Sequence, residues 1–160
     1  MSRIVSLALA ILVVVADQLS KAWVVAFLGV ASGGPPYRTV TSVFNLVLAL
    51  NPGVSFGLLR GDSPWNVVVL SLLAVAIVGG LLFWMWRTPS ALVASAIGLV
   101  CGGALGNVID RLRHGAVTDF LDFHWGGLHF WAFNLADSAI SVGVFLLITE
   151  SLLARRKSPK

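Results

Sequence analysis

The chain has 160 residues, of which 58% are hydrophobic and only 11% are charged, and its mean hydropathy is +0.92. Soluble domains contain about 25% charged residues, so this balance excludes an ordinary soluble domain and indicates an α-helical integral membrane protein. The net charge of +4 does not indicate a nucleic-acid partner, because the few basic residues are divided between the two ends of the apolar segments.

Four apolar stretches are long enough to cross a membrane, whose hydrocarbon core requires about 20 helical residues. The sequence predicts spans at residues 4–28, 65–86, 91–112 and 137–153, within a single membrane domain of residues 1–160. Segments 29–64 and 113–136 are then extracytoplasmic. An even number of spans places both termini on the same side of the membrane.

Basic residues beside the spans predict which side that is, since Lys and Arg are retained in the cytoplasm. Six fall on the side of the termini: Arg3, Arg87, Arg155, Arg156, Lys157 and Lys160. Four fall opposite: Arg38, Arg60, Arg111 and Arg113. We therefore expect cytoplasmic termini. Of the seven acids only Glu150 is then cytoplasmic, so the other acids gather towards the outer face.

The first span contains Asp17 and Lys21, which are four residues apart and share a helix face, with the acid in the favourable N-terminal position. The pair has two interpretations. It is either a structural ion pair that steadies the outer part of the span or a pair that contacts a substrate directly.

The segment after the first span opens with the helix breakers SGGPP at residues 32–36. Apolar residues from Val40 to Leu50 then alternate with Thr39, Thr41 and Asn45, which predicts a half-buried strand on the membrane interface. The strand is expected to break at residues 51–53, Asn-Pro-Gly, and its edge to continue over residues 54–57. Asn51 is either a turn residue or an amide that binds a peptide backbone.

The third span carries Gly98, Gly102 and Gly106 at intervals of four, a pattern that lets another helix approach closely. Its single cysteine, Cys101, is expected to be a small packing residue. Polar residues extend a neighbouring face to the outer end of this span: Asn107, Asp110 and Arg111. Arg111 either pairs with Asp110 or binds a carboxylate, phosphate or carbonyl group.

Residues 117–123 read as another extended segment, in which Asp119 and Asp122 must point to opposite faces because side chains alternate along a strand. The histidines His114, His124 and His129 lie nearby, but their spacing matches no compact zinc pattern. We therefore predict no metal and no cofactor.

The fourth span opens with Asn134 and Asp137, whose spacing resembles a capping box, and an acid in the first turn also suits the helix dipole. Ser141 extends the same polar face, which a cap does not require. Capping and a functional role are both open for Asp137. Ser138 and Ser141 have no His or Lys base beside them in the pattern, which argues against a serine nucleophile.

Residues 106–137 hold four of the seven acids between two apolar spans, where a buried charge is costly, so a functional site is the default interpretation. Two close carboxylates supply the base and the acid that amide hydrolysis by water requires, and only one of them ionises readily. A small proton or ion carrier and a non-catalytic scaffold are the alternatives.

Five motifs together resemble the lipoprotein signal peptidase (signal peptidase II) family, nearly from end to end. They are DQLSK at residues 17–21, NPGVSFG at 51–57, GNVIDR at 106–111, VTDF at 117–120 and FNLAD at 133–137. The resemblance implies four transmembrane helices, a small extracytoplasmic β-sheet, or cradle, between spans 1 and 2, and an extended loop between spans 3 and 4.

The resemblance also implies an aspartic endopeptidase of the bacterial inner membrane that cuts prolipoproteins before a diacylglyceryl-modified cysteine. The catalytic pair carries over to Asp119 and Asp137. Residues that match the family's substrate-binding positions are Asn51, Gly53, Asn107, Arg111 and Asn134, and supporting residues are Asp17, Lys21, Asp110 and Ser141. The expected partners are lipidated prolipoproteins and membrane lipid, and the expected state is a monomer.

Overall fold

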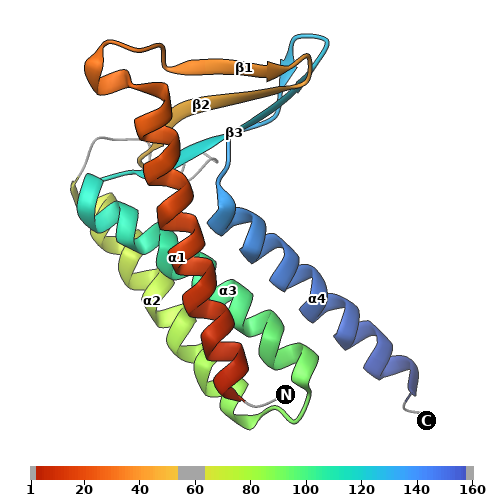
Figure 1. Ribbon diagram of the computed structural model, residues 1–160. Helices are drawn as coiled ribbons and strands as arrows, with labels where there is room; N and C mark the ends of the chain where they lie inside the picture. Colours follow the sequence, from red (N-terminus) through yellow and green to blue (C-terminus); the bar gives the residue numbers. More distant parts are fainter. Residues whose placement is uncertain (1–2, 54–63, 158–160) are drawn as a thin grey trace.

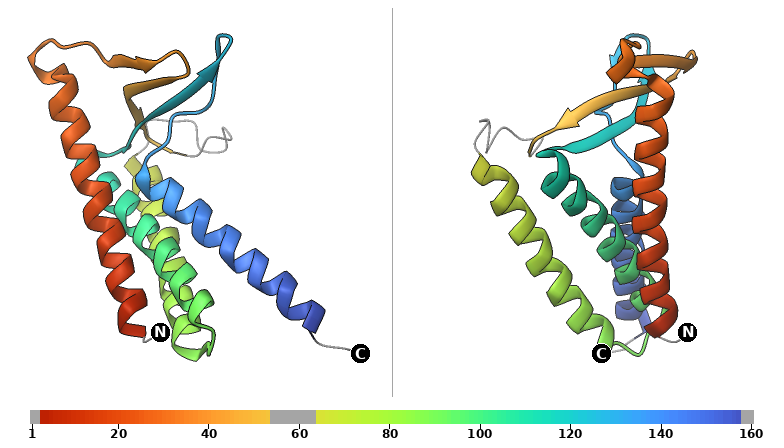
Figure 2. Two further views of the ribbon diagram at one scale, coloured as in Figure 1. Left: turned by 45° about the vertical axis from the view of Figure 1, so that its right-hand side comes forward. Right: turned by 60° about the vertical axis from the view of Figure 1, so that its left-hand side comes forward.

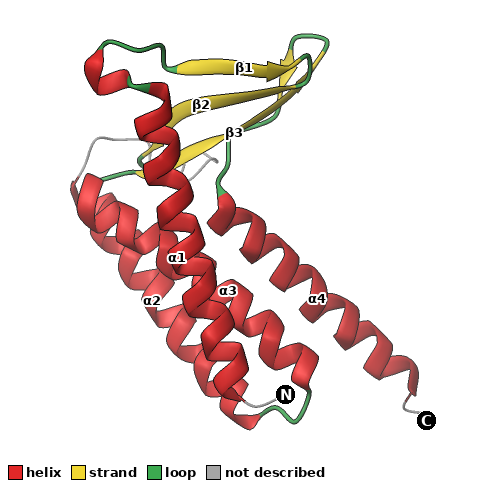
Figure 3. Ribbon diagram, viewed as in Figure 1, coloured by secondary structure: helices red, strands yellow, loops and turns green. Residues whose placement is uncertain are grey.

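The computed structural model describes residues 3–53 and 64–157, which form four long helices with an antiparallel sheet at one end of the helices (Figures 1 and 3). The helices are α1 (Arg3–Leu28), α2 (Pro64–Arg87), α3 (Ala91–His114) and α4 (Leu135–Lys157), and a 3-10 turn, η1, covers Val30–Ser32. The strands are β1 (Tyr37–Thr41), β2 (Phe44–Asn51), β3 (Val117–Trp125) and β4 (Leu128–His129). The expected strand edge at residues 54–57 lies outside the described residues.

All four helices are long and apolar enough to cross a membrane. This confirms the four predicted spans. The largest difference between a predicted and an observed first residue is at α4, which begins at Leu135 where the sequence predicted residue 137. The first residues of α1 and the last residues of α4 lie at the end of the bundle away from the sheet (Figures 1 and 2). The sheet lies at the opposite end of the bundle, where α1 ends and α4 begins.

Helix α3 packs against each of the other three helices, and glycines allow the closest approaches. A Cβ atom on Gly98 would lie 2.5 Å from the backbone oxygen of Ser6, and one on Gly102 would lie 2.6 Å from that of Ala10, both in α1. The predicted glycine face is thus confirmed as the α1 contact. A Cβ atom on Gly143 of α4 would likewise lie 2.7 Å from the backbone oxygen of Ala96 in α3.

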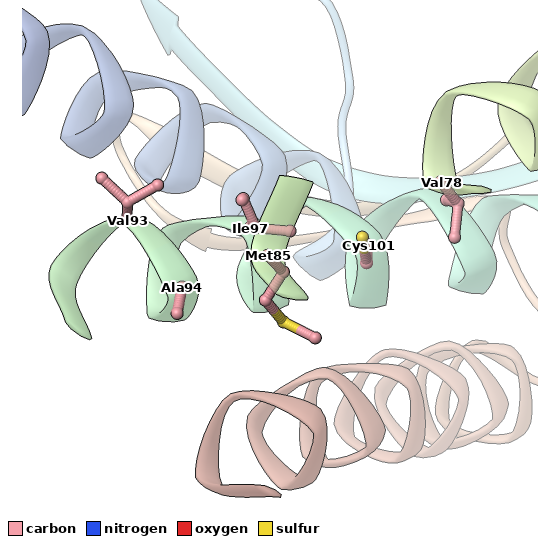
Figure 4. Packing of buried hydrophobic residues seen from close by; sticks show 6 residues of the cluster. All are labelled: Val78, Met85, Val93, Ala94, Ile97 and Cys101. Carbon is pink, nitrogen blue, oxygen red and sulfur yellow. The ribbon is translucent and has the colours of Figure 1, made fainter. Parts of the chain in front are cut away.

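An apolar cluster joins α2 to α3 and contains Val78, Met85, Val93, Ala94, Ile97 and Cys101 (Figure 4). Cys101 is a free thiol with 1% of its surface exposed, which confirms its expected packing role. On the outside of the bundle, many large apolar side chains are exposed, such as Ile11, Leu72 and Phe145. Such a surface suits contact with lipid rather than water.

The segment predicted as one strand before Asn51 is a hairpin of two strands, so that expectation was wrong. Thr41 pairs with Phe44 across a turn formed by Ser42 and Val43. This turn contains no Gly, Asn or Asp, the residues that mark a two-residue hairpin, and it interrupts the apolar alternation for only two positions, so the pattern did not indicate a second strand. The predicted end of β2 at Asn51 is confirmed.

Residues 113–136 contribute more than an extended loop, because β3 pairs with β2 and completes a four-stranded sheet in the order β1-β2-β3-β4. Strands β3 and β4 are joined by Gly126 and Gly127, with φ of 57° and 83°. Two successive positive φ values define the type I′ turn that suits a two-residue hairpin. The sheet therefore joins the segment after α1 to the segment that precedes α4.

Candidate active site

A buried ion network lies where the sheet meets α1 and α3. Lys21 Nζ is 2.7 Å from Asp17 Oδ2 and 3.0 Å from Asp110 Oδ2, and it donates a 3.1 Å hydrogen bond to Asn107 Oδ1. The predicted Asp17–Lys21 pair is confirmed, and it belongs to a larger network that also contains Asp110 and Asn107. Asp110 of α3 forms its ion pair with Lys21 of α1. The described residues contain no Asp110–Arg111 ion pair.

The same network fixes the start of both segments that carry the predicted catalytic acids. Asp17 Oδ1 accepts a 3.0 Å hydrogen bond from the backbone N–H of Ala136, in the first turn of α4. Asp110 Oδ2 accepts one of 2.9 Å from the backbone N–H of Thr118 in β3. Each bond removes an unpaired N–H from the buried interior and anchors one segment to the helix bundle.

Gln18 is a member of this network that the sequence analysis did not single out. Its Nε2 donates to Asp110 Oδ1 at 2.8 Å and to the backbone oxygen of Gly106 at 3.2 Å, so it links α1 to α3. Its only signal in the sequence is its position beside Asp17, to which it also donates at 3.2 Å, because its partners Gly106 and Asp110 come from a different helix.

Asn134 and Asp137 form a reciprocal capping box at the start of α4. The backbone N–H of Asp137 donates to Asn134 Oδ1 at 2.9 Å, and the backbone N–H of Asn134 donates to Asp137 Oδ2 at 3.2 Å. The capping interpretation is therefore confirmed. The other oxygen of Asp137 accepts a 2.8 Å bond from Asn107 Nδ2, which a cap alone does not require.

Asp119 is held from two sides and has 3% of its surface exposed. Asn134 Nδ2 donates to its Oδ1 at 2.7 Å, and Asn51 Nδ2 donates to its Oδ2 at 3.1 Å. Asn134 is fully buried. Its amide nitrogen contacts Asp119, and its amide oxygen caps the helix that carries Asp137. One asparagine side chain therefore bridges the two acidic residues.

Burial raises the pKa of Asp119 from 3.8 to about 6, and the negative charge of Asp137 acts in the same direction. Hydrogen bonds from Asn51 and Asn134 and the positive charge of Lys21 lower that pKa, but burial outweighs them. The two carboxyl groups therefore interact electrostatically. Such a pair favours a state with one proton shared between two acids.

The remaining predicted residues take different places. Asn51 Oδ1 accepts a 3.2 Å hydrogen bond from the backbone N–H of Gly53, so Asn51 shapes its own turn while its amide nitrogen reaches Asp119. Arg111 has a buried Nε without a hydrogen-bond partner among the described residues. Ser141 is exposed, and within the described ranges it makes no hydrogen bond to the acidic residues.

Asp122 belongs to a second cluster, separate from that of Asp119. Its Oδ2 accepts a 2.9 Å hydrogen bond from Asn45 Nδ2 and lies 2.9 Å from His129 Nδ1. Asp119 and Asp122 thus have separate partners although they lie on one strand. Sequence reasoning missed the second cluster, because its members meet only after β2, β3 and β4 pair.

Comparisons with known proteins show the family of the chain. A family described as "Signal peptidase (SPase) II" matches residues 9–153. A lipoprotein signal peptidase of Burkholderia multivorans is 46% identical, over 91% of this chain and 86% of its own length, and one of Shewanella loihica is 44% identical, over 92% and 85%. A bacterial membrane enzyme solved by the in meso method at 2.3 Å matches with a TM-score of 0.79 and 28% identity, over 98% of this chain and 93% of its own. The chain therefore belongs to the lipoprotein signal peptidase (signal peptidase II) family of aspartic peptidases.

Proposed function

We propose that Asp119 and Asp137 are the catalytic pair with which this peptidase removes signal peptides from prolipoproteins. The observation that carries the proposal is the convergence of the two acids on Asn134, which contacts one carboxylate and caps the helix of the other. Each carboxylate receives one N–H donor on each oxygen, so both are oriented before substrate arrives. Two oriented carboxyl groups, one of them with a raised pKa, suit water-mediated amide hydrolysis.

In the proposed reaction, a water molecule between the acids attacks the scissile carbonyl carbon. The ionised carboxylate takes a proton from the water, and the protonated carboxyl donates its proton to the carbonyl oxygen, which gives a tetrahedral diol. The diol then collapses as the C–N bond breaks and a proton passes to the leaving amine. No covalent acyl-enzyme forms, and the pair returns to its starting state with one proton.

The proposed substrate-binding residues divide into two groups. Asn107 and Asn134 use their amide groups within the protein, so we propose that they act by positioning the two acids. Asn51 and Gly53 lie at the end of β2, beside Asp119, where an extended peptide would have to pass. Arg111 has a free buried Nε among the described residues, which suits a carbonyl or ester oxygen of the substrate.

The supporting residues act through the acids rather than on the substrate. Asp17, Lys21 and Asp110 share one buried network that fixes the starts of α4 and β3. We propose a diacylglyceryl-modified cysteine as the residue after the cut, since lipid chains could lie against the apolar faces of the helices. A monomer contains both acids and is sufficient for this mechanism.

The alternative of a proton or ion carrier requires charged groups along the bundle. In the described part of the chain, the buried charged side chains lie at the sheet end of the helices, and Glu150 lies near the opposite end, where Ser90 contacts it. The apolar middle of the bundle separates them, which favours the peptidase mechanism.

We propose that both termini are cytoplasmic and that the sheet and the acids lie at the outer face of the inner membrane. Single cysteines introduced by Ser42→Cys, in the exposed turn between β1 and β2, and by Thr88→Cys, between α2 and α3, test this orientation. In intact spheroplasts, a membrane-impermeant maleimide should label the first and leave the second unlabelled until the cells are opened. The reverse pattern contradicts the proposed orientation, and wild type with its buried Cys101 serves as the blank.

The pH dependence of cleavage tests the proton shared by the pair. The pKa of Asp119 is raised to about 6, so its carboxyl holds a proton below that pH and loses it above. Loss of the proton leaves two carboxylates and no acid, so kcat/KM, which reports the free enzyme, should fall as pH rises through about 6. Asn51→Leu removes a hydrogen bond that lowers this pKa, so the falling limb should move to higher pH. A flat profile in wild type contradicts the shared proton.

A further inference from the structure

We propose that Asp122, His124 and His129 form a binding site for a divalent transition-metal ion such as Zn²⁺ at the outer end of the sheet. One ligand atom from each of these side chains lies within 4.8 Å of the others. The site is distinct from the acidic pair, and the proposal holds whichever residues perform the cleavage.

Backbone pairing explains why three residues with no compact spacing meet here. Asp122 and His124 are two residues apart on β3, so their side chains emerge on the same face. His129 is the partner of His124 in the β3–β4 register, across the type I′ turn. The expectation of no metal site relied on spacing along the chain, and such spacing does not describe ligands that pair across strands.

The ligand atoms are already close to a coordinating arrangement. His129 Nδ1 is 2.9 Å from Asp122 Oδ2, and the rings of His124 and His129 stack with their centroids 4.9 Å apart. Zinc binds imidazole nitrogen and carboxylate oxygen at about 2.0–2.2 Å, so in a tetrahedral site ligand atoms are roughly 3.4 Å apart. Side-chain rotation would have to bring the three ligand atoms from within 4.8 Å of one another to this spacing.

Asn45 supplies a second, independent observation beside the cluster. Its Nδ2 contacts both Asp122 Oδ2, at 2.9 Å, and His124 Nδ1, at 3.4 Å, while its buried Oδ1 has no hydrogen-bond partner among the described residues. The amide nitrogen therefore contacts the carboxylate and one imidazole of the cluster from outside it, as the partners that orient metal ligands do.

The surroundings allow an ion to enter. An open cavity of about 570 Å³ is lined by both histidines and by Val43, Phe123, Trp125, Leu128 and Phe130. Two imidazoles and one carboxylate favour Zn²⁺, Cu²⁺ or Ni²⁺ over Mg²⁺ and Ca²⁺, which prefer oxygen ligands alone. An ion held here would tie β4 to β3 and so steady the hairpin that leads into Asn134.

Zinc titration of the purified full-length protein in detergent, with any affinity tag removed, tests the site. We expect one equivalent of Zn²⁺ to bind in competition with a chromophoric chelator, and each of Asp122→Asn, His124→Gln and His129→Gln to weaken binding at least about tenfold. His129 is exposed, so its substitution should leave the fold intact. Cu²⁺ in place of Zn²⁺ should give an electron paramagnetic resonance spectrum with nitrogen coupling that is lost in the histidine variants.

Two controls separate this site from others. His114→Gln changes an exposed histidine at the end of α3, outside the cluster, and should bind Zn²⁺ like wild type. The double variant Asp119→Asn/Asp137→Asn should also retain the ion, whereas loss there would place the ion at the acidic pair. Absence of saturable binding in the micromolar range, or binding unchanged in the three variants, would leave only an Asp122–His129 ion pair and overturn the proposal.

Discussion

Asp119→Asn and Asp137→Asn are each expected to lower kcat/KM for a lipidated precursor by about 10²–10⁴-fold, the contribution typical of a general acid or base. Asparagine keeps the size of the side chain but neither ionises nor donates a carboxyl proton. Each variant therefore removes one half of the proton transfer in the proposed mechanism. Cleavage of the precursor by purified enzyme, followed as a mass shift on a gel, measures the loss.

Glu150→Gln provides the matched control, because it makes the same chemical change at the other end of α4, where Glu150 contacts only Ser90 among the described residues. It should cleave at the wild-type rate. Thermal unfolding in detergent checks that the inactive variants are folded, since Asp137 also caps α4 and loss of a cap costs about 1 kcal/mol. Cleavage at the normal rate in either Asp variant would falsify the paired-acid mechanism.

Lys21→Met is expected to lower the free energy of unfolding by about 3–5 kcal/mol, the cost of breaking a buried ion pair by removing one partner. Lys21 has 4% of its surface exposed and lies against two buried carboxylates, Asp17 and Asp110. Without its ammonium group, two negative charges face each other away from water. Chemical or thermal unfolding in detergent measures the change.

The triple variant Asp17→Asn/Lys21→Met/Asp110→Asn separates the charge effect from packing. It removes all three charges at once and should recover much of the stability, because no unpaired ion remains buried. Arg113→Met removes an exposed cation from the same end of α3 and should change stability little. If the triple variant is no more stable than Lys21→Met alone, the loss comes from packing rather than from charge.

The membrane spans could be predicted from the sequence because span length and hydropathy are local properties. The glycine face of α3 could also be predicted, since spacing along one helix decides which residues lie on the same face. The hairpin at Ser42 and Val43 was not, because its turn has no characteristic residue. The β3–β4 turn at Gly126 and Gly127 was overlooked although its two glycines are a recognised signal.

The candidate site was predictable as a set of residues but not as a set of contacts. The five motifs contain the acids and the asparagines, yet nothing in them says that Asn134 touches Asp119 or that Lys21 pairs with Asp110. These contacts join segments separated by 15 and 89 positions in the chain, and only packing of the elements decides them. The same reason concealed the cluster of Asp122 with Asn45 and His129.

The capping of α4 has a consequence for how a peptide gains access to the acids. Asp137 is fixed by Asn134, and the neighbouring Ala136 is bound to Asp17 of α1, so this acid cannot shift without unwinding the first turn of its helix. Asp119 lies on a strand whose far end is an exposed hairpin. Thr118, beside Asp119, is bound to Asp110 of α3. Entry of the substrate should therefore displace only the exposed hairpin end of the sheet, while both acids keep their positions relative to the helices.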